Sequence, residues 1–227
     1  MELTKKNLDQ FVVKAALDAV IKEQLINFHG NILDVGCGKM PYKSLILENY
    51  SIQSYVGLDI ENAREYDKYV KPDVIWNGKE MPFADGSFDT AMATEVLEHC
   101  FEPSVLLRES HRILKSKGLL FFTVPYLWPL HETPNDAYRY TPWSIEMHLK
   151  NAGFREIKIH PMGGWHAAMA QMMGLWVARS PLSRTSRSIL TRLAIPIMKY
   201  LLTKEKGKKV TFAEGQMITG LYGTARK

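Results

Sequence analysis

The stretch that decides the fold is Ile32-Leu33-Asp34-Val35-Gly36-Cys37-Gly38. A short apolar run leads directly into two glycines, a pattern typical of a buried strand that ends in a tight turn. Glycine lets the backbone approach a ligand closely, and open α/β sheets bind ligands at the carboxyl ends of their strands. We therefore expect a ligand site here, with Asp34 able to accept hydrogen bonds from an ammonium group. Taken alone, the pattern also fits an ordinary tight turn.

The spacing of nearby residues narrows the kind of ligand. A dinucleotide fingerprint needs a third glycine, and Pro41 occupies that position, so a pyrophosphate site is disfavoured. Asp59 follows Gly36 by 23 residues, at the end of a second apolar run. An acid near that distance from a glycine turn suits the binding of ribose hydroxyls, although a solvated carboxylate at a strand end is the alternative.

Strand-like and helix-like segments alternate along most of the chain. This alternation predicts an α/β fold, with a seven-stranded, mostly parallel sheet, helices on both faces and a single domain over residues 1–227. The expected strands are 31–35, 54–60, 73–76, 88–94, 119–124, 154–160 and 217–225. The expected helices are 7–27, 41–48, 103–115, which Gly118 would stop, and 142–153.

Composition predicts a cytoplasmic protein. The chain has 227 residues, of which 46% are hydrophobic and 23% charged, as in a protein with a real core. Its two cysteines, Cys37 and Cys100, form no readable disulfide framework. The first ten residues lack the apolar segment of a secretory signal. No uninterrupted apolar run reaches about 18 residues, so we expect no membrane-spanning helix.

Three further segments make the pattern specific. They are Met81–Asp89 (MPFADGSFD), Thr94–His99 (TEVLEH) and Lys117–Pro125 (KGLLFFTVP). Together with the glycine turn and Gly57–Ile60 (GLDI), they match in order the landmarks of class I methyltransferases that use S-adenosylmethionine (SAM). The chain most resembles the small type 11 branch, over roughly residues 30–160 and the final strand. The resemblance implies a Rossmann-like fold and SAM as cofactor.

The resemblance also implies roles for individual residues. The methionine end of SAM would lie against Asp34, Gly36, Cys37 and Gly38, with Thr94 and Glu95 at its border. Asp59 would bind the ribose, and Ile60, Asn77 and Gly78 would lie beside adenine. The chain departs from the family at Asn77, where an Asp is usual, and at Met40, where a further glycine is common. An amide can still accept a hydrogen bond from the adenine amine.

The aromatic loop 126–140 follows the fifth expected strand and carries the candidate catalytic residues. His131, Asp136 and Arg139 are the candidates: a histidine can deprotonate a hydroxyl acceptor at neutral pH, and an arginine can steer an acidic or phosphorylated substrate. The alternative is a structural loop fixed by an Asp136–Arg139 ion pair. Similar loops occur in small methyltransferases of polysaccharide-assembly pathways, which favours a small-molecule or glycan-type acceptor. Glu98 and His99 fit a helix cap and a surface histidine better than a site.

A helical insertion, residues 162–210, separates the last two expected strands. Nine Lys and Arg residues but only one acid, Glu205, lie between Arg179 and Lys209, so the net charge of +5 is concentrated there. Apolar residues beside these cations predict a lid, a dimer contact or a peripheral contact with the inner face of an anionic membrane. The chain would be a monomer or a homodimer.

The sequence leaves several functions open. We expect methyl transfer to a hydroxyl, but nitrogen or carbon acceptors, or a lipid or quinone precursor, remain alternatives, as does a SAM-binding, membrane-docking module without catalysis. Nucleic acid is disfavoured, because aromatic residues do not interleave with the basic ones and the Asn/Asp-Pro-Pro-Tyr segment of DNA amino-methyltransferases is missing. No His/Cys cluster has metal-ligand spacing, so no metal is expected.

Overall fold

The computed structural model describes residues 1–61 and 69–227. These residues form two compact units. The first unit comprises Met1–Lys22, Tyr126–Trp128 and His160–Leu221, and the second comprises Glu23–Pro125, Pro129–Ile159 and Tyr222–Lys227. The expectation of one domain over 1–227 therefore stays a prediction. The glycine turn, Asp59 and most of the loop 126–140 all belong to the second unit.

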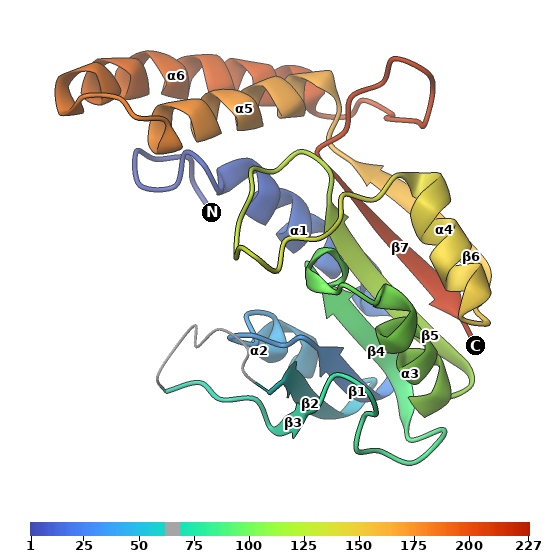
Figure 1. The fold of residues 1–227 in the computed structure, drawn as a ribbon. Helices are drawn as coiled ribbons and strands as arrows, with labels where there is room; N and C mark the ends of the chain where they lie inside the picture. Colours follow the sequence, from blue (N-terminus) through green and yellow to red (C-terminus); the bar gives the residue numbers. More distant parts are fainter. Residues whose placement is uncertain (62–68) are drawn as a thin grey trace. The chain divides into compact units, whose positions relative to one another are not determined.

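The predicted sheet is confirmed. Seven strands pair in the order β3-β2-β1-β4-β5-β7-β6. Their bounds are Gly30–Val35 (β1), Ile52–Ile60 (β2), Val74–Trp76 (β3), Phe88–Thr94 (β4), Leu114–Pro125 (β5), Arg155–Met162 (β6) and Gly220–Arg226 (β7). The β1–β2, β1–β4, β2–β3 and β4–β5 pairs are all parallel, whereas β7 points opposite to β4 (Figure 1).

The register of the parallel strands aligns the carboxyl ends that the sequence picked out. Val35 pairs with Leu58, and Ile60 pairs with Trp76. On the other side of β1, Asp34 pairs with Met92, two residues before the end of β4. The strand order reverses at β1, which has β2 on one side and β4 on the other. Open α/β sheets hold their ligands at such a reversal of strand order.

Short helices flank this sheet. Within the second unit, α2 (Lys43–Leu47) packs against β2, and α3 (Pro103–Ile113) packs against β5 and α4 (Pro142–Asn151). The expected start of α4 is confirmed, since the Thr141 side chain accepts from the backbone of Ser144 in a capping box. The long helix expected at 7–27 is α1 (Phe11–Gln24) followed by one 3₁₀ turn, Leu25–Asn27.

The expected boundary between the helix 103–115 and the strand 119–124 is wrong. Gly118 was predicted to stop a helix that reaches Lys115, but α3 ends at Ile113, and β5 begins at Leu114. Leu114 is fully buried and pairs with Phe88, and the register then shifts, so that Thr90 pairs with Leu119. Burial of Leu114 therefore starts the strand early. Gly118 lies inside the strand, where an added Cβ would be only 2.8 Å from the carbonyl of Lys115.

The first unit holds the insertion. Its helices α5 (Trp165–Arg179) and α6 (Arg184–Glu205) lie side by side (Figure 1), as the prediction of a helical insertion required. They share a core with the N-terminal segment, formed by Leu3, Leu8, Val12, Ala167, Ala170, Val177, Ala194 and Met198. Among the described helices, none is both long and apolar enough to cross a membrane.

Candidate functional site

A pocket of about 720 Å³ opens at the carboxyl ends of β1, β2, β3 and β4. This volume lies in the range of small-molecule sites. Of the ten residues predicted to bind a cofactor, half line it: Gly36, Asp59, Ile60, Gly78 and Glu95. The other half do not: Asp34, Cys37, Gly38, Asn77 and Thr94. The pocket is therefore where the sequence predicted a ligand, although five of the residues predicted to contact it do not line the pocket.

The glycine turn forms the floor of the pocket and requires glycine at Gly36. This residue has a φ of 66°, in the left-handed region, and a Cβ placed on it would lie 2.5 Å from Cγ2 of Val96. The backbone N–H groups of Gly36 and Cys37 both donate to the carbonyl of Leu58, which ties the turn to β2. A side chain at this position would displace either the turn or the segment that follows β4.

Asp34 is buried beneath this turn. Its Oδ2 accepts a hydrogen bond from the Tyr55 hydroxyl, while among the described residues its buried Oδ1 receives none. Burial is the main cause that raises the pKa of Asp34 to about 7, and the Tyr55 hydrogen bond opposes the shift. A buried carboxylate with an unused oxygen can hold a cationic group.

Asp59 and the residues around it form the next part of the wall. Its two carboxylate oxygens accept from the backbone N–H groups of Gly38, at 3.0 Å, and Ile60, at 2.8 Å. Ile60 exposes an apolar side chain, and Trp76 and Gly78 lie alongside it in the pocket wall. Burial raises the pKa of Asp59, and its backbone hydrogen bonds partly oppose the shift. An acid beside an apolar surface suits a ribose joined to a base.

Asn77 has a local structural role. Its Oδ1 accepts from the backbone N–H groups of Lys79, at 2.9 Å, and Glu80, at 3.1 Å. Such bonds are the usual way in which an Asn side chain holds a turn. The oxygen expected to meet an adenine amine is thus already engaged, and Asn77 does not line the pocket. Its assignment to the cofactor stays a prediction that this geometry does not support.

Glu95 lies at the end of β4 in a strained conformation. Its φ is 54°, which is uncommon outside glycine. Its carboxylate accepts from the Thr123 hydroxyl at 2.9 Å, and its backbone N–H donates to the carbonyl of the same residue at 3.1 Å. Loss of solvent raises the pKa of Glu95 to about 7. Strain that the surroundings hold in place is frequent at functional sites.

Glu98 and His99 correct the sequence analysis. They belong to a 3₁₀ turn, Leu97–His99, and not to a helix cap, since Glu102 precedes α3. Glu98 is fully buried, and among the described residues neither of its oxygens receives a hydrogen bond. Burial, together with the charge of Glu95, raises its pKa well above the usual range. His99 lines the pocket, and its Nε2 lies 3.8 Å from Oε1 of Glu98.

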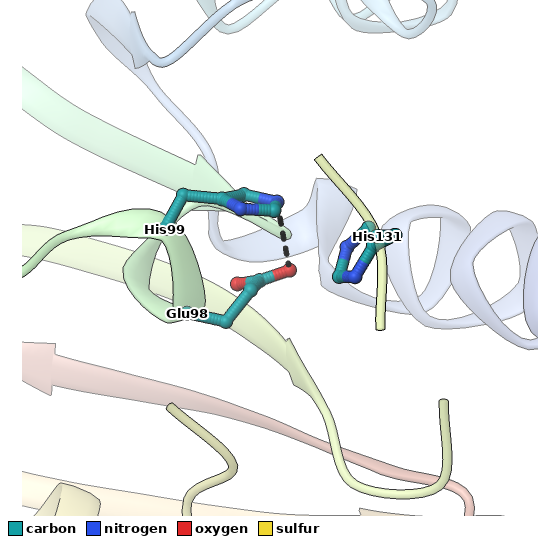
Figure 2. Close-up of side chains that lie close together, drawn as sticks. All are labelled: Glu98, His99 and His131. Carbon is teal, nitrogen blue, oxygen red and sulfur yellow. Dashed lines mark ion pairs between the residues drawn. The ribbon is translucent and has the colours of Figure 1, made fainter. Parts of the chain in front are cut away.

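His131 completes this group. Its ring meets that of His99 edge-on, with 4.7 Å between centroids, and Figure 2 shows Glu98, His99 and His131 close together. Nδ1 of His131 lies 3.2 Å from Oδ2 of Asp136. Burial is the main cause that lowers the pKa of His131, so the imidazole is neutral at neutral pH. A neutral imidazole can accept a proton or bind a cation.

Asp136 and Arg139 form the ion pair that was the structural alternative for their loop. The guanidinium donates to both carboxylate oxygens of Asp136, at 2.6 and 2.8 Å. These bonds hold the pKa of Asp136 well below its usual range. Neither residue, nor His131, lines the pocket, whereas Glu132, Thr133 and Asn135 of the same loop do. Arg139 is therefore placed to fix the loop and not to meet a substrate.

The pocket wall is acidic. Among the described residues that line it, none is Lys or Arg, one is histidine, and five are carboxylic acids: Asp59, Glu61, Glu95, Glu102 and Glu132. Such a wall favours a cationic ligand and disfavours an anionic one. Sequence analysis missed Glu61, Trp76, Phe101, Glu102 and Val105 as lining residues. Their positions directly after GLDI, at the end of the expected strand 73–76 and shortly after TEVLEH were the available signal.

Comparisons with known proteins agree with this architecture. Residues 33–122 match a family model described as a methyltransferase domain. The chain is 35% identical over 131 residues to the uncharacterized protein MJ1252 of Methanocaldococcus jannaschii, covering 56% of this chain and 45% of the relative. It is 31% identical over 99 residues to the malonyl-[acyl-carrier protein] O-methyltransferase of Legionella pneumophila, covering 40% and 35%. The chain thus spans less than half the length of either relative.

Similarity in three dimensions extends over nearly the whole chain. A SAM-dependent methyltransferase from Archaeoglobus fulgidus superposes with a TM-score of 0.59 at 17% identity, over 95% of this chain and 94% of that one. At this identity the likeness establishes the fold. The chain has the Rossmann-like fold of SAM-dependent methyltransferases, with its glycine turn inside the matched domain.

The raised pKa of Asp34 predicts a pH dependence of stability. Because its pKa is higher in the folded chain than its ordinary value of 3.8, the unfolded chain loses this proton first. The protonated Asp34 therefore stabilises the folded chain at acidic pH, and this contribution is lost as the pH rises towards about 7. Between pH 5 and 8, the free energy of unfolding of the wild type should fall, and in Asp34→Asn this fall should be about 2–3 kcal/mol smaller. Urea unfolding at each pH measures it.

The control is Asp85→Asn, which changes a mostly exposed carboxylate and should leave the slope with pH unchanged. Glu95 titrates in the same range, so a residual slope is expected in Asp34→Asn. Parallel curves for wild type and Asp34→Asn would mean that Asp34 is already ionised in the folded chain.

Proposed function

We propose that this chain transfers a methyl group from SAM to a hydroxyl of a small-molecule or glycan-type acceptor. The observation that carries the proposal is the pocket itself. Its lining combines Gly36 of the glycine turn and Asp59 with Glu95, His99 and Glu132. The first two residues suit a nucleoside with a cationic side chain, and the other three suit an acceptor that must lose a proton. The family match over 33–122 supports the same conclusion.

The residues present fit SAM. The buried, unused oxygen of Asp34 and the acidic pocket wall suit a molecule with an ammonium group and a sulfonium. The floor at Gly36, where a Cβ would meet Val96, leaves room for a ligand that lies against the backbone. When bound, SAM supplies an electrophilic methyl group, which an attacking oxygen takes as the carbon–sulfur bond breaks and the hydroxyl proton leaves. Alignment in a closed pocket can supply roughly 7–11 kcal/mol of the barrier reduction.

His131 is the proposed proton acceptor for the hydroxyl: it does not itself line the pocket, but its ring meets that of His99, which does. Asp136 lies beside its Nδ1 and orients the ring, and Arg139 holds Asp136 in place. In this arrangement Nδ1 of His131 faces Asp136, so Nε2 is the nitrogen that would take the proton. Arg139 then acts as a positioning residue, which replaces its expected role in steering an acidic substrate. The alternative, a SAM-binding module without catalysis, would also use the acidic wall for the cofactor but would not need His99 and His131.

Asp59→Asn tests the cofactor site. Asn keeps the shape of the side chain but replaces the charged acceptor, whose hydrogen bonds contribute about 1.5–3 kcal/mol each. We expect S-adenosylhomocysteine to bind roughly 10–100-fold more weakly by isothermal titration calorimetry. Asp85→Asn, away from the pocket wall, should bind as wild type does. Failure of wild type to bind S-adenosylhomocysteine would refute the proposed function.

His131→Ala tests the acceptor site. Binding of S-adenosylhomocysteine should be unchanged, because His131 does not line the pocket. Transfer of radiolabelled methyl from SAM to acceptors in cell extract should fall by about 10²–10⁴-fold, the usual contribution of a general base. Unchanged turnover would exclude His131, and no labelled acceptor despite tight cofactor binding would favour the module without catalysis.

A second function, docking on an anionic membrane surface, is favoured by one feature of α6. Ile189, Leu193, Ile197 and Tyr200 are each 45–60% exposed at helical spacing, so the stripe they form faces away from the shared core. Arg184, Arg192, Lys199 and Lys204 of the same helix are also exposed. Exposed apolar and basic groups on one helix suit an anionic interface, where each cation contributes about 1 kcal/mol.

Vesicle flotation tests this docking. The full chain should float with phosphatidylserine-containing vesicles at low salt, and it should not float with phosphatidylcholine alone or at high salt. The double variant Leu193→Asp/Ile197→Asp should lose flotation, because it places charges in the apolar stripe. The matched control is Ile26→Asp, at a residue 88% exposed in the other unit. Equal flotation of both variants would exclude α6 as the contact.

A further inference from the structure

Glu98, His99 and His131 form a compact cluster that the proposed function uses only in part. One potential ligand atom from each of the three residues lies within 4.8 Å of the other two. Glu98 and His99 come from the 3₁₀ turn after β4, and His131 comes from the loop 126–140 (Figure 2). The expectation of no metal rested on sequence spacing. It could not foresee that this loop returns His131 to residues 32 and 33 positions earlier in the chain.

The carboxylate of Glu98 is the main evidence for a cation site. The residue is fully buried, and no hydrogen bond reaches either oxygen from the described residues. Burying a carboxylate without compensation is costly, so such groups are usually paired or bind a metal ion. Nε2 of His99 lies 3.8 Å from Oε1 of Glu98, too far for a hydrogen bond. A cation between the two would satisfy both.

The surroundings of the two imidazoles are those of metal ligands. Nδ1 of His99 lies 2.9 Å from the carbonyl oxygen of Asn135, which directs Nε2 towards Glu98. Nδ1 of His131 faces Asp136, which Arg139 holds by two hydrogen bonds. Metal-binding histidines commonly use their second nitrogen in this way, on a carbonyl or a carboxylate. Nδ1 of His99 thus has a carbonyl partner at hydrogen-bond distance, and Nδ1 of His131 lies at ion-pair distance from a carboxylate.

We propose that Glu98, His99 and His131 bind a divalent transition-metal ion such as Zn²⁺ or Mn²⁺. Two imidazoles and one carboxylate form the donor set of open sites for such ions. Mg²⁺ and Ca²⁺ prefer oxygen ligands and suit this set less well. Three protein ligands leave further coordination positions for a substrate oxygen.

The site's place on the pocket wall gives the ion a role, which rests on the proposed function. His99 and Glu132 both line the pocket, with 4.0 Å between Nε2 of His99 and Oε2 of Glu132. An acceptor hydroxyl that coordinates the ion loses its proton more readily. The proton passes to Glu132, the oxygen–methyl bond forms, and the carbon–sulfur bond breaks. With the ion bound, His131 is a ligand, so this role replaces its role as proton acceptor.

Metal titration of the chain tests the site directly. Wild type, stripped with EDTA, is titrated with Mn²⁺ while free ion is followed by electron paramagnetic resonance, and with Zn²⁺ by calorimetry. One ion per chain should bind. Glu98→Gln, which removes the charge but keeps the shape, and His99→Ala should each weaken binding at least tenfold. His29→Ala, at an exposed histidine elsewhere in the same unit, is the matched control and should bind as wild type does.

Two readouts separate the possible failures. Circular dichroism and binding of S-adenosylhomocysteine check that each variant is folded with its cofactor pocket intact. Stoichiometric binding that Glu98→Gln weakens and His29→Ala does not supports the site. Absence of stoichiometric binding in wild type, or equal binding by wild type and Glu98→Gln, overturns the proposed metal site. Glu98 would then be neutralised by a bound proton. If S-adenosylhomocysteine does not bind to wild type, the proposed function fails whatever the metal result.

Discussion

The site depends on the close approach of Gly36 to Val96. At this point the turn after β1 lies directly against the segment that leaves β4, with no space for a Cβ between them. Because β1 and β4 are adjacent and parallel, this contact holds the segments that follow the two strands together at one edge of the sheet. Gly36 belongs to the pocket floor, and the strained Glu95 and the turn that carries Glu98 and His99 lie within three residues of Val96. A side chain at Gly36 would disturb all of them together.

The second constraint is the burial of negative charge. Asp34, Glu95 and Glu98 all have raised pKa values because the fold removes them from water. A fold stabilised only by its core would gain from apolar residues at these positions, since uncompensated buried carboxylates are destabilising. Their concentration around one pocket is characteristic of a functional site. Two of the three also have buried oxygens without hydrogen bonds from the described residues, which separates them from structural ion pairs such as Asp136–Arg139.

The sequence could predict features that depend on neighbouring residues, but not those that depend on contacts between residues far apart in the chain. The strand ends, the glycine turn and Asp59 follow from local alternation and from the rule that parallel strands end at one edge, and their placement around one pocket needed no further information. The end of α3 could not be predicted in this way, because burial of Leu114 against β4 overrides the stop signal at Gly118. Asn77 was assigned by family position, whereas its actual partners are backbone groups two and three residues ahead.

The loop 126–140 shows why residue chemistry alone could not locate the acceptor site. His131, Asp136 and Arg139 have the side chains of a catalytic group, and the same side chains make a loop anchor. Geometry separates the two uses: Arg139 is held by Asp136, Asp136 faces His131, and His131 meets His99 at the pocket wall. These successive contacts thus connect the three residues to His99, a histidine outside the loop. Of these residues it is therefore His99 that faces the pocket in the proposed acceptor site, and its neighbour Glu98 supplies a buried carboxyl group.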